Sequence, residues 1–334
     1  MSRLIIVDRA ADLAPLRAGS ADPLAPEMFA LTSPSRHLAL LDATGELVAR
    51  CSLWRARDAD GEPTNAGLVG HYAAADADAG GELLEHASAW HRSEGCERVI
   101  GPMDGSTWHR YRLVTDRGTE PAFFLEPDNP DDWPRHFTDT GFVPLATYLS
   151  MLNLDISQTD PRSDQRLAEL ERAGVTLRTI DIERFDEELA AIHKLSLAAF
   201  ARNFLYSPIG LENFVAAYRP ILPHLEPELV LLAECDGVLI GFVFGMPDLM
   251  EPARGAPLRT VIIKSLAVHP AWAGDGLGTV LGDYLLRAAR KLGFERAIHA
   301  LMREDSVSAR MAVPHATTMR RYTLYEKSLD QRER

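Results

Sequence analysis

Residues 265–281 read Ser-Leu-Ala-Val-His-Pro-Ala-Trp-Ala-Gly-Asp-Gly-Leu-Gly-Thr-Val-Leu. An apolar strand leads into a turn with glycines at 274, 276 and 278, and an amphipathic helix follows. Because glycine has no Cβ, such a turn lets backbone N–H groups converge at the helix N-terminus, where they can bind phosphate. The segment predicts an α/β fold with a phosphate-binding strand–turn–helix unit.

The helix is expected from about Gly278 to Lys291, where Leu281, Leu285 and Ala289 fall on one face. Gly293 follows as a C-terminal stop signal.

Two common nucleotide-binding motifs do not fit this turn. A dinucleotide-binding fingerprint would need a third glycine at position 279, where the sequence has Thr279. A Walker A loop would need Gly-Lys-Ser/Thr, whereas Gly278 is followed by Thr279 and Val280. Both alternatives fail on spacing.

An internal repeat extends the prediction to the rest of the chain. Residues 68–98 align without a gap on residues 266–296, and ten of the 31 pairs are identical. Average composition predicts roughly two identical pairs by chance. A hairpin signal precedes each copy, at Gly45 and at Asp236-Gly237. We therefore expect two tandem units, each a mixed central sheet flanked by helices.

The boundary between the units is expected in a polar segment, Ser157–Ser163, which Pro161 interrupts. The length of 334 residues agrees with two domains of about 150 residues each. The predicted units are residues 1–155 and 156–334.

The charge of the chain limits its partners. A formal net charge of −13 argues against a nucleic-acid surface, which needs a basic face. It weakly favours a cationic small molecule as substrate. No run of residues approaches the eighteen apolar residues of a membrane span, so no membrane partner is expected.

The cysteines point to a reducing compartment. Cys51, Cys96 and Cys235 are odd in number and show neither a disulfide framework nor metal-ligand spacing. The N-terminus reaches charged residues too soon for a signal peptide. A cytoplasmic protein without a metal is the expectation, and the sequence does not indicate an oligomeric state.

The strand–turn–helix segment resembles the acyl-CoA motif of the GNAT-type N-acetyltransferases. That motif is a strand, a short lead-in often ending Val-x-Pro, then Arg/Gln-x-x-Gly-x-Gly/Ala and a helix. Here the matching residues are Leu266–Val268, His269-Pro270, Ala273–Gly278 and Leu281. The resemblance covers residues 229–296 and, through the repeat, most of the chain. Two positions depart from it: Ala273 replaces the first Arg/Gln, and an acid, Asp275, lies inside the loop.

The resemblance implies that the second unit binds acetyl-CoA or another acyl-CoA as co-substrate. Backbone groups of Leu266 and Val268 would hold the pantetheine arm. The pyrophosphate would lie in the loop and first helical turn formed by Gly274, Gly276, Leu277, Gly278 and Thr279.

The first copy carries acids where the second carries glycines. Asp76, Asp78 and Gly80 occupy the positions of 274, 276 and 278. Each aspartate adds a Cβ and a negative charge, which repels a phosphate by a few kcal/mol at contact range. The N-terminal unit is therefore predicted to be a degenerate copy that binds no CoA.

Catalytic residues are less well marked. The family often uses a helical tyrosine to protonate the leaving thiolate, and alignment on Asp305 and Ser308 puts Ala312 at that position. Tyr325, in Leu324-Tyr325-Glu326-Lys327, matches the letters of that motif and is the candidate, although residues 321–325 are more typical of a terminal strand. Lys264 is expected to be a solvated strand-edge side chain, and the alternative is a contact to phosphate or substrate.

The function implied by the resemblance is acyl transfer from acyl-CoA to an amine by direct attack, without a covalent enzyme intermediate. Neither the acceptor nor the acyl chain length is indicated. The alternative is a non-catalytic acyl-CoA-binding or regulatory protein of the same fold, which the departures at Ala273 and Asp275 favour.

Overall fold

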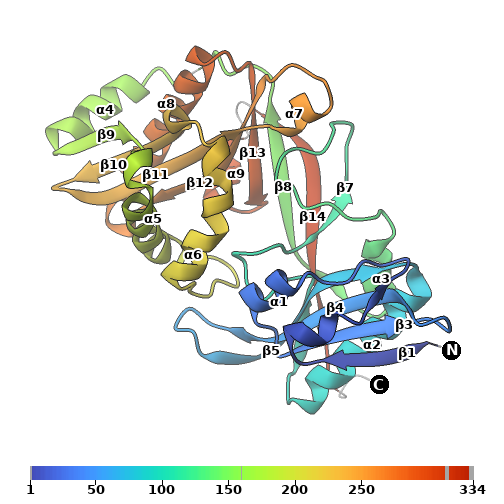
Figure 1. Ribbon diagram of the computed structural model, residues 1–334. Coiled ribbons are helices and arrows are strands. Elements are labelled where there is room, and N and C mark those ends of the chain that lie inside the picture. Colours follow the sequence, from blue (N-terminus) through green and yellow to red (C-terminus); the bar gives the residue numbers. More distant parts are fainter. Residues whose placement is uncertain (1, 159, 313–315, 331–334) are drawn as a thin grey trace.

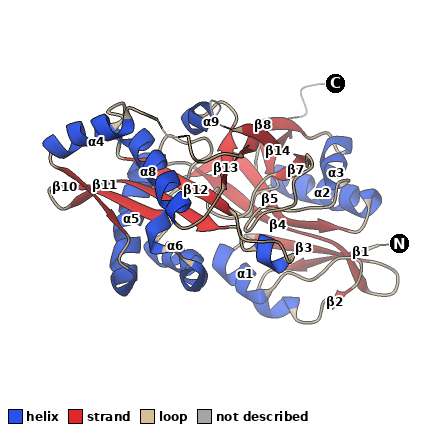
Figure 2. Ribbon diagram, turned by 90° about the horizontal axis from the view of Figure 1, so that it is seen from above, coloured by secondary structure: helices blue, strands red, loops and turns tan. Residues whose placement is uncertain are grey.

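The computed structural model describes residues 2–158, 160–312 and 316–330. Within these residues, fourteen strands form one sheet, in the order β1-β3-β4-β5-β6-β14-β8-β13-β12-β11-β10-β9, with β2 beside β4 and β7 beside β14. Helices cover both faces of this sheet (Figures 1 and 2). The predicted mixed α/β architecture is confirmed.

The N-terminal half supplies seven of these strands and three helices before the segment that joins the halves. The strands are β1 (Arg3–Val7), β2 (Arg17–Ala18), β3 (Arg36–Leu41), β4 (Glu46–Arg57), β5 (Pro63–Ala74), β6 (Arg98–Gly101) and β7 (Leu113–Asp116); the helices are α1 (Pro26–Thr32), α2 (Ala77–Ser93) and α3 (Trp133–Asp139).

The C-terminal half repeats this plan. Its strands are β9 (Val175–Thr179), β10 (Val230–Cys235), β11 (Val238–Pro247), β12 (Thr260–Val268) and β13 (Arg296–Arg303); its helices are α4 (Ser163–Arg172), α5 (Phe185–Phe200), α6 (Leu211–Tyr218), α7 (Met250–Ala253), α8 (Leu277–Lys291) and α9 (Val307–Ala312). Each half contains a hairpin, a third antiparallel strand, a helix and a parallel strand. The parallel pairs are β5 with β6 and β12 with β13.

The helix after the glycine turn forms as its periodicity predicts. On α8, the side chains of Val280, Leu281, Leu285 and Ala289 are fully buried and pack against β11 and β12. Gly293, at φ +94°, follows the last turn. Packing of this apolar face fixes the glycine turn against the end of β12.

The last strands of the two halves are exchanged. β8 (Val143–Asn153) is the last strand of the N-terminal half in sequence, but it pairs with β13 of the C-terminal half. β14 (Thr317–Ser328), at the end of the chain, pairs with β6 of the N-terminal half. The two exchanged strands also pair with each other, and Figure 1 shows them side by side between the halves. One continuous sheet results, and the boundary near residue 155 stays a prediction.

A long segment of the N-terminal half crosses onto the C-terminal half. Trp108 packs against Phe200 and Phe214 with ring centroids 6.2 and 5.8 Å apart, and its indole N–H donates to the Ser207 carbonyl at 2.8 Å. Phe124 donates its backbone N–H to Asp248 at 2.8 Å. The N-terminal half therefore covers the α5–α6 face of its neighbour.

No helix within the described ranges has both the length and the apolar character needed to cross a bilayer.

Candidate functional site

The parallel strands β12 and β13 separate part-way along their length. Their pairing begins at Thr260 with Arg296 and ends at Ile263 with His299, although β12 continues to Val268. The β11 partners of Ile263 and Ser265 are consecutive residues. Lys264, which lies between Ile263 and Ser265, therefore has no partner on β11 and forms a bulge in β12. Beyond it, backbone groups on the β13-facing edge of β12 lack their usual ladder partners. We call this opening the wedge.

The glycine loop lies next to the wedge. Gly274 and Gly276 have φ values of +99° and +80°, a left-handed conformation that favours glycine. Gly276 is the N-cap residue of α8, and no side chain among the described residues caps this helix. The first N–H groups of α8 are therefore free to bind an anion. A Cβ on Gly278 would lie 3.4 Å from Leu266 Cδ2, which shows that the loop packs directly on β12.

The structure thus brings six predicted residues into one strand–loop–helix unit that borders the wedge, and Thr279 continues it in the first turn of α8. The six are Leu266, Val268, Gly274, Gly276, Leu277 and Gly278.

The equivalent site in the first copy is filled by the protein itself. Asp76 caps α2 by accepting the Ala79 N–H at 2.9 Å, so a carboxylate occupies the helix N-terminus. The segment after β6 also remains against β5: Met103 donates its N–H to Val69 O at 2.8 Å. The Asp104 carboxylate accepts the His71 N–H at 2.5 Å. These contacts support the prediction that the first copy binds no CoA.

Tyr325 lies away from the glycine loop. It is on β14, opposite Gly101 of β6, and its side chain is 4% exposed in the core of the N-terminal half. Its ring stacks on Phe137 with centroids 5.7 Å apart, and burial raises its pKa. The terminal-strand alternative is the one observed, and the structure does not bring Tyr325 together with the residues around α8.

A different tyrosine reaches the bulge. Tyr218, at the end of α6, is close enough to Ser265, the residue after Lys264, for the serine side chain to lower the pKa of the phenol. Burial has the larger effect and raises the pKa of this phenol. No local sequence signal marks Tyr218, because α6 and β12 are far apart along the chain.

Lys264 is partly buried at the bulge. Burial lowers its pKa to about 8; the nearby charge of Arg112 acts in the same direction, and Glu126 opposes it. Lys264 is therefore partly withdrawn from solvent at the bulge.

Arg166 on α4 also approaches the loop. A Cβ on Gly276 would lie 3.1 Å from Arg166 Cδ, and the Arg166 guanidinium pairs with Asp160 at 3.1 Å. The loop has Ala273 where the family motif has Arg or Gln. Arg166 of α4 therefore supplies a positive charge beside the loop from another helix.

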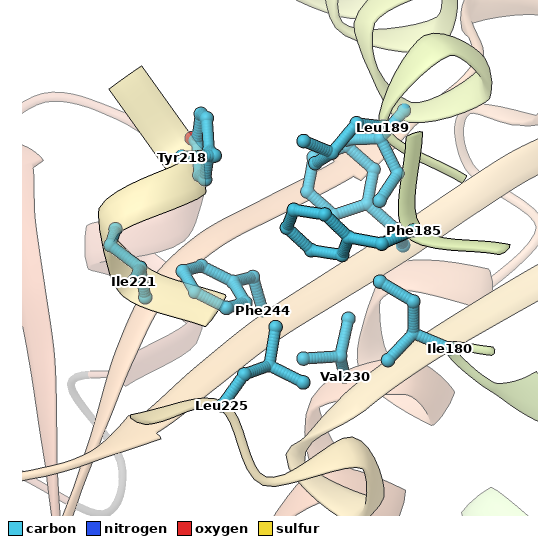
Figure 3. Close-up of a pocket in the computed structure, with 10 residues that line it drawn as sticks. Ile180, Phe185, Leu189, Tyr218, Ile221, Leu225, Val230 and Phe244 are labelled. Atoms are coloured by element: carbon cyan, nitrogen blue, oxygen red, sulfur yellow. The ribbon is translucent and has the colours of Figure 1, made fainter. Parts of the chain in front are cut away.

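An apolar pocket lies beneath α5 and α6, on the face covered by the N-terminal half. Its lining includes Phe185 and Leu189 of α5, Tyr218 of α6 and Phe244 of β11, whose side chains converge in Figure 3. Its free volume is about 20 Å³, enough for about one water molecule. As it stands, the pocket admits no hydrocarbon chain.

No group of three or more His, Cys, Asp or Glu side chains in the described ranges could hold a metal ion.

Comparisons with known proteins agree with this geometry. A family model described as "Acetyltransferase (GNAT) family" matches residues 189–311, which contain the wedge and the glycine loop. Residues 189–311 therefore belong to a GNAT-family domain. A solved tandem GNAT protein from the clavulanic acid biosynthesis pathway aligns over 100% of both chains with a TM-score of 0.51 at 14% identity. The predicted GNAT-type fold is confirmed, and the full-length alignment agrees with a tandem arrangement.

Two curated proteins are similar over most of this chain. Protein YghO of Escherichia coli is 23% identical over 74% of this chain and 70% of its own length. A bacterial ceramide synthase of Caulobacter vibrioides is 20% identical over 80% of this chain and 77% of its own length.

Proposed function

We propose that the C-terminal unit transfers an acyl group from acyl-CoA to the nitrogen of an amine. The observation that carries this proposal is the wedge beside an uncapped helix N-terminus on a single β12–loop–α8 unit. The first N–H groups of α8 would bind the pyrophosphate. The unpaired edge of β12, at Leu266 and Val268, would hold the pantetheine arm and polarise the thioester carbonyl.

In this reaction the amine nitrogen attacks the thioester carbonyl carbon, the C–S bond breaks, and the nitrogen loses a proton. Tyr218 would supply a proton to the departing thiolate, because its hydroxyl lies beside Ser265 at the bulge. Arg166 would add a positive charge near the pyrophosphate. This assignment replaces Tyr325, whose ring is in the core of the other unit.

The name of one relative agrees with N-acyl transfer. A ceramide is an amide of a long-chain amine, and the Caulobacter relative is a ceramide synthase. At 20% identity this supports the reaction class only. A long chain would enter the pocket beneath α5 only after Phe185 or Tyr218 had moved, since the free volume is about 20 Å³.

Thermal unfolding of the whole chain with and without acetyl-CoA tests the site. A ligand at one hundred times its Kd stabilises the native state by about 2.7 kcal/mol, so we expect a clear rise in Tm. Gly276→Asp should abolish that rise, because it places a carboxylate at the N-terminus of α8. Gly255→Asp is the matched control: Gly255 has a similar φ of +75° and nothing near its would-be Cβ. An equal rise in wild type and Gly276→Asp would contradict the proposal.

A second candidate is acyl-CoA binding without catalysis, which the position of Tyr325 favours. Release of free thiol from acetyl-CoA across a panel of amines separates the two candidates. Binding without release would favour this alternative. A cytoplasmic location remains part of the proposal.

A further inference from the structure

Arg112, between β6 and β7, has an unusual backbone and a buried side chain. Its φ is +70°, a conformation that costs a non-glycine residue energy and persists only where its surroundings impose it. Its backbone N–H donates to the Pro102 carbonyl at 2.8 Å, which holds the segment in place. The side chain is 6% exposed. The fold therefore forces this arginine inward.

The Arg112 guanidinium lies between two aromatic rings. Its carbon is 3.8 Å from the ring centroid of Tyr111 and 4.2 Å from that of Tyr148. Both rings are within cation–π range of the guanidinium. Nε and Nη1 are buried, and no protein atom in the described ranges accepts a hydrogen bond from either.

The position of Arg112 relates it to the wedge. Tyr148 on β8 is the register partner of Arg303, at the end of β13, so the guanidinium lies toward the open ends of the strands. Lys264 is on the other side of the opening, one residue beyond the last β12–β13 pair. The two cations are close enough for the charge of Arg112 to lower the pKa of Lys264.

The buried carboxylate of Glu126, whose charge acts on Lys264, is already engaged. Glu126 pairs with Arg320 at 3.0 Å, accepts the hydroxyl of Tyr322, and accepts the Phe123 N–H at 3.1 Å. Its charge is therefore largely offset by Arg320. Arg112 and Lys264 leave an excess of positive charge in this part of the molecule.

We propose that Arg112 and Lys264 bind an anionic group, a carboxylate or a phosphate, carried by the amine acceptor. The planar N–H fork of Arg112 matches either anion in two-point geometry, and Lys264 adds a point charge. This inference rests on the proposed acyl transfer. It gives the first unit a role in the active site of the second, because Arg112 comes from the unit that binds no CoA.

The anion at Arg112 is distinct from the phosphates of CoA. The rings around Arg112 belong to a core cluster shared by both halves, whereas Leu277, Leu266 and Val268 of the CoA loop belong to the core under α8. The net charge of −13 does not oppose an anion here, because charges more than about 8 Å away through solvent are screened at physiological salt. The acceptor is then an amine that also carries a negative group.

Calorimetric titration of the whole chain with inorganic phosphate tests the site without relying on catalysis. We expect saturable binding that weakens at least tenfold in Arg112→Gln and in Lys264→Gln. Arg110→Gln, an exposed arginine on the same segment, should bind as wild type does. Unchanged affinity in both Arg112→Gln and Lys264→Gln, or no saturable binding to wild type, would overturn the proposal. If Arg112→Gln fails to fold, Lys264→Gln carries the test alone.

Displacement of bound phosphate by small amines shows whether the site recognises a carboxylate or a phosphate. It also keeps the test of the anion site apart from the test of acyl-CoA binding. β-Alanine should displace phosphate better than propylamine if a carboxylate is recognised, and O-phosphoethanolamine better than ethanolamine if a phosphate is. Equal displacement by the charged and uncharged members of both pairs would overturn the proposal. The rise in Tm on addition of acetyl-CoA is measured in the same variants. If the wild type binds phosphate but shows no such rise, acyl-CoA binding is refuted and the anion site is retained.

Discussion

Replacing Lys264 with methionine should make the protein more stable at neutral pH. Burial, with the charge of Arg112, lowers the pKa of Lys264 from its ordinary 10.5 to about 8, and Glu126 only partly opposes this. Each unit of pKa corresponds to about 1.4 kcal/mol, so holding this ammonium charged costs the folded state on the order of 3 kcal/mol. Methionine removes the charge and keeps a long unbranched side chain at the bulge.

The gain should depend on pH in a way that isolates the charge. Below pH 8 Lys264 is protonated in both the folded and the unfolded protein, and the cost is complete. Between pH 8 and 10.5 the folded protein releases this proton while the unfolded chain keeps it, so the cost shrinks as the pH rises. The advantage of Lys264→Met should therefore be full at pH 7 and fade across this window.

Denaturant unfolding at pH 7, 8, 9 and 10 measures the effect. Lys194→Met, an exposed lysine of α5, is the control and should change the unfolding free energy little at any of these pH values. A stabilisation that is the same at every pH would show that burial of apolar surface, not charge, is responsible. No stabilisation at pH 7 would refute the reasoning. Inorganic phosphate should stabilise the wild type more than Lys264→Met, because the lysine that it neutralises is gone.

Three further predictions follow from the site. Asp76→Ala should cost about 1 kcal/mol of unfolding free energy through loss of the α2 cap, and should leave the acetyl-CoA affinity unchanged. Tyr325→Phe should leave kcat near that of the wild type, whereas Tyr218→Phe should lower kcat by tenfold or more, both measured by thiol release. Arg166→Gln should raise the Kd for acetyl-CoA several-fold, measured calorimetrically, and Arg162→Gln, an exposed arginine at the start of the same helix, should not.

The parts of the fold that depend on local sequence could be predicted. The strand, glycine turn and amphipathic helix at residues 266–291 lie within one short segment. Their hydrophobic periodicity and their need for glycine can be recognised from the local sequence. The repeat then extended that segment to the N-terminal half. The contrast between Asp76 and Gly274 also predicted a real structural difference, since the aspartate caps its own helix.

The parts that depend on distant pairing could not be predicted. Tyr325 illustrates this: its letters match a helical motif of the family, but β14 is held as a strand by β6 and β8. Arg112 and Tyr218 carry no local signal either, because each reaches the wedge through a tertiary contact. The partial burial of Lys264 could not be predicted either, because a one-residue bulge between β11 and β12 has no clear sequence signature.

The strand exchange explains why a unit without a CoA site would persist. β14, the last strand of the C-terminal half, lies between β6 and β8, so removing the N-terminal half would leave that strand without its β6 partner. Removing the C-terminal half would leave the eleven-residue strand β8 without either of its partners, β13 and β14, and such an unpaired strand is prone to aggregation. Each half thus supplies a strand that the other needs to close its sheet. The first half also supplies Arg112 to the wedge, so it can lose acyl-CoA binding through Asp76 and Asp78 and still be required for both folding and recognition of the acceptor.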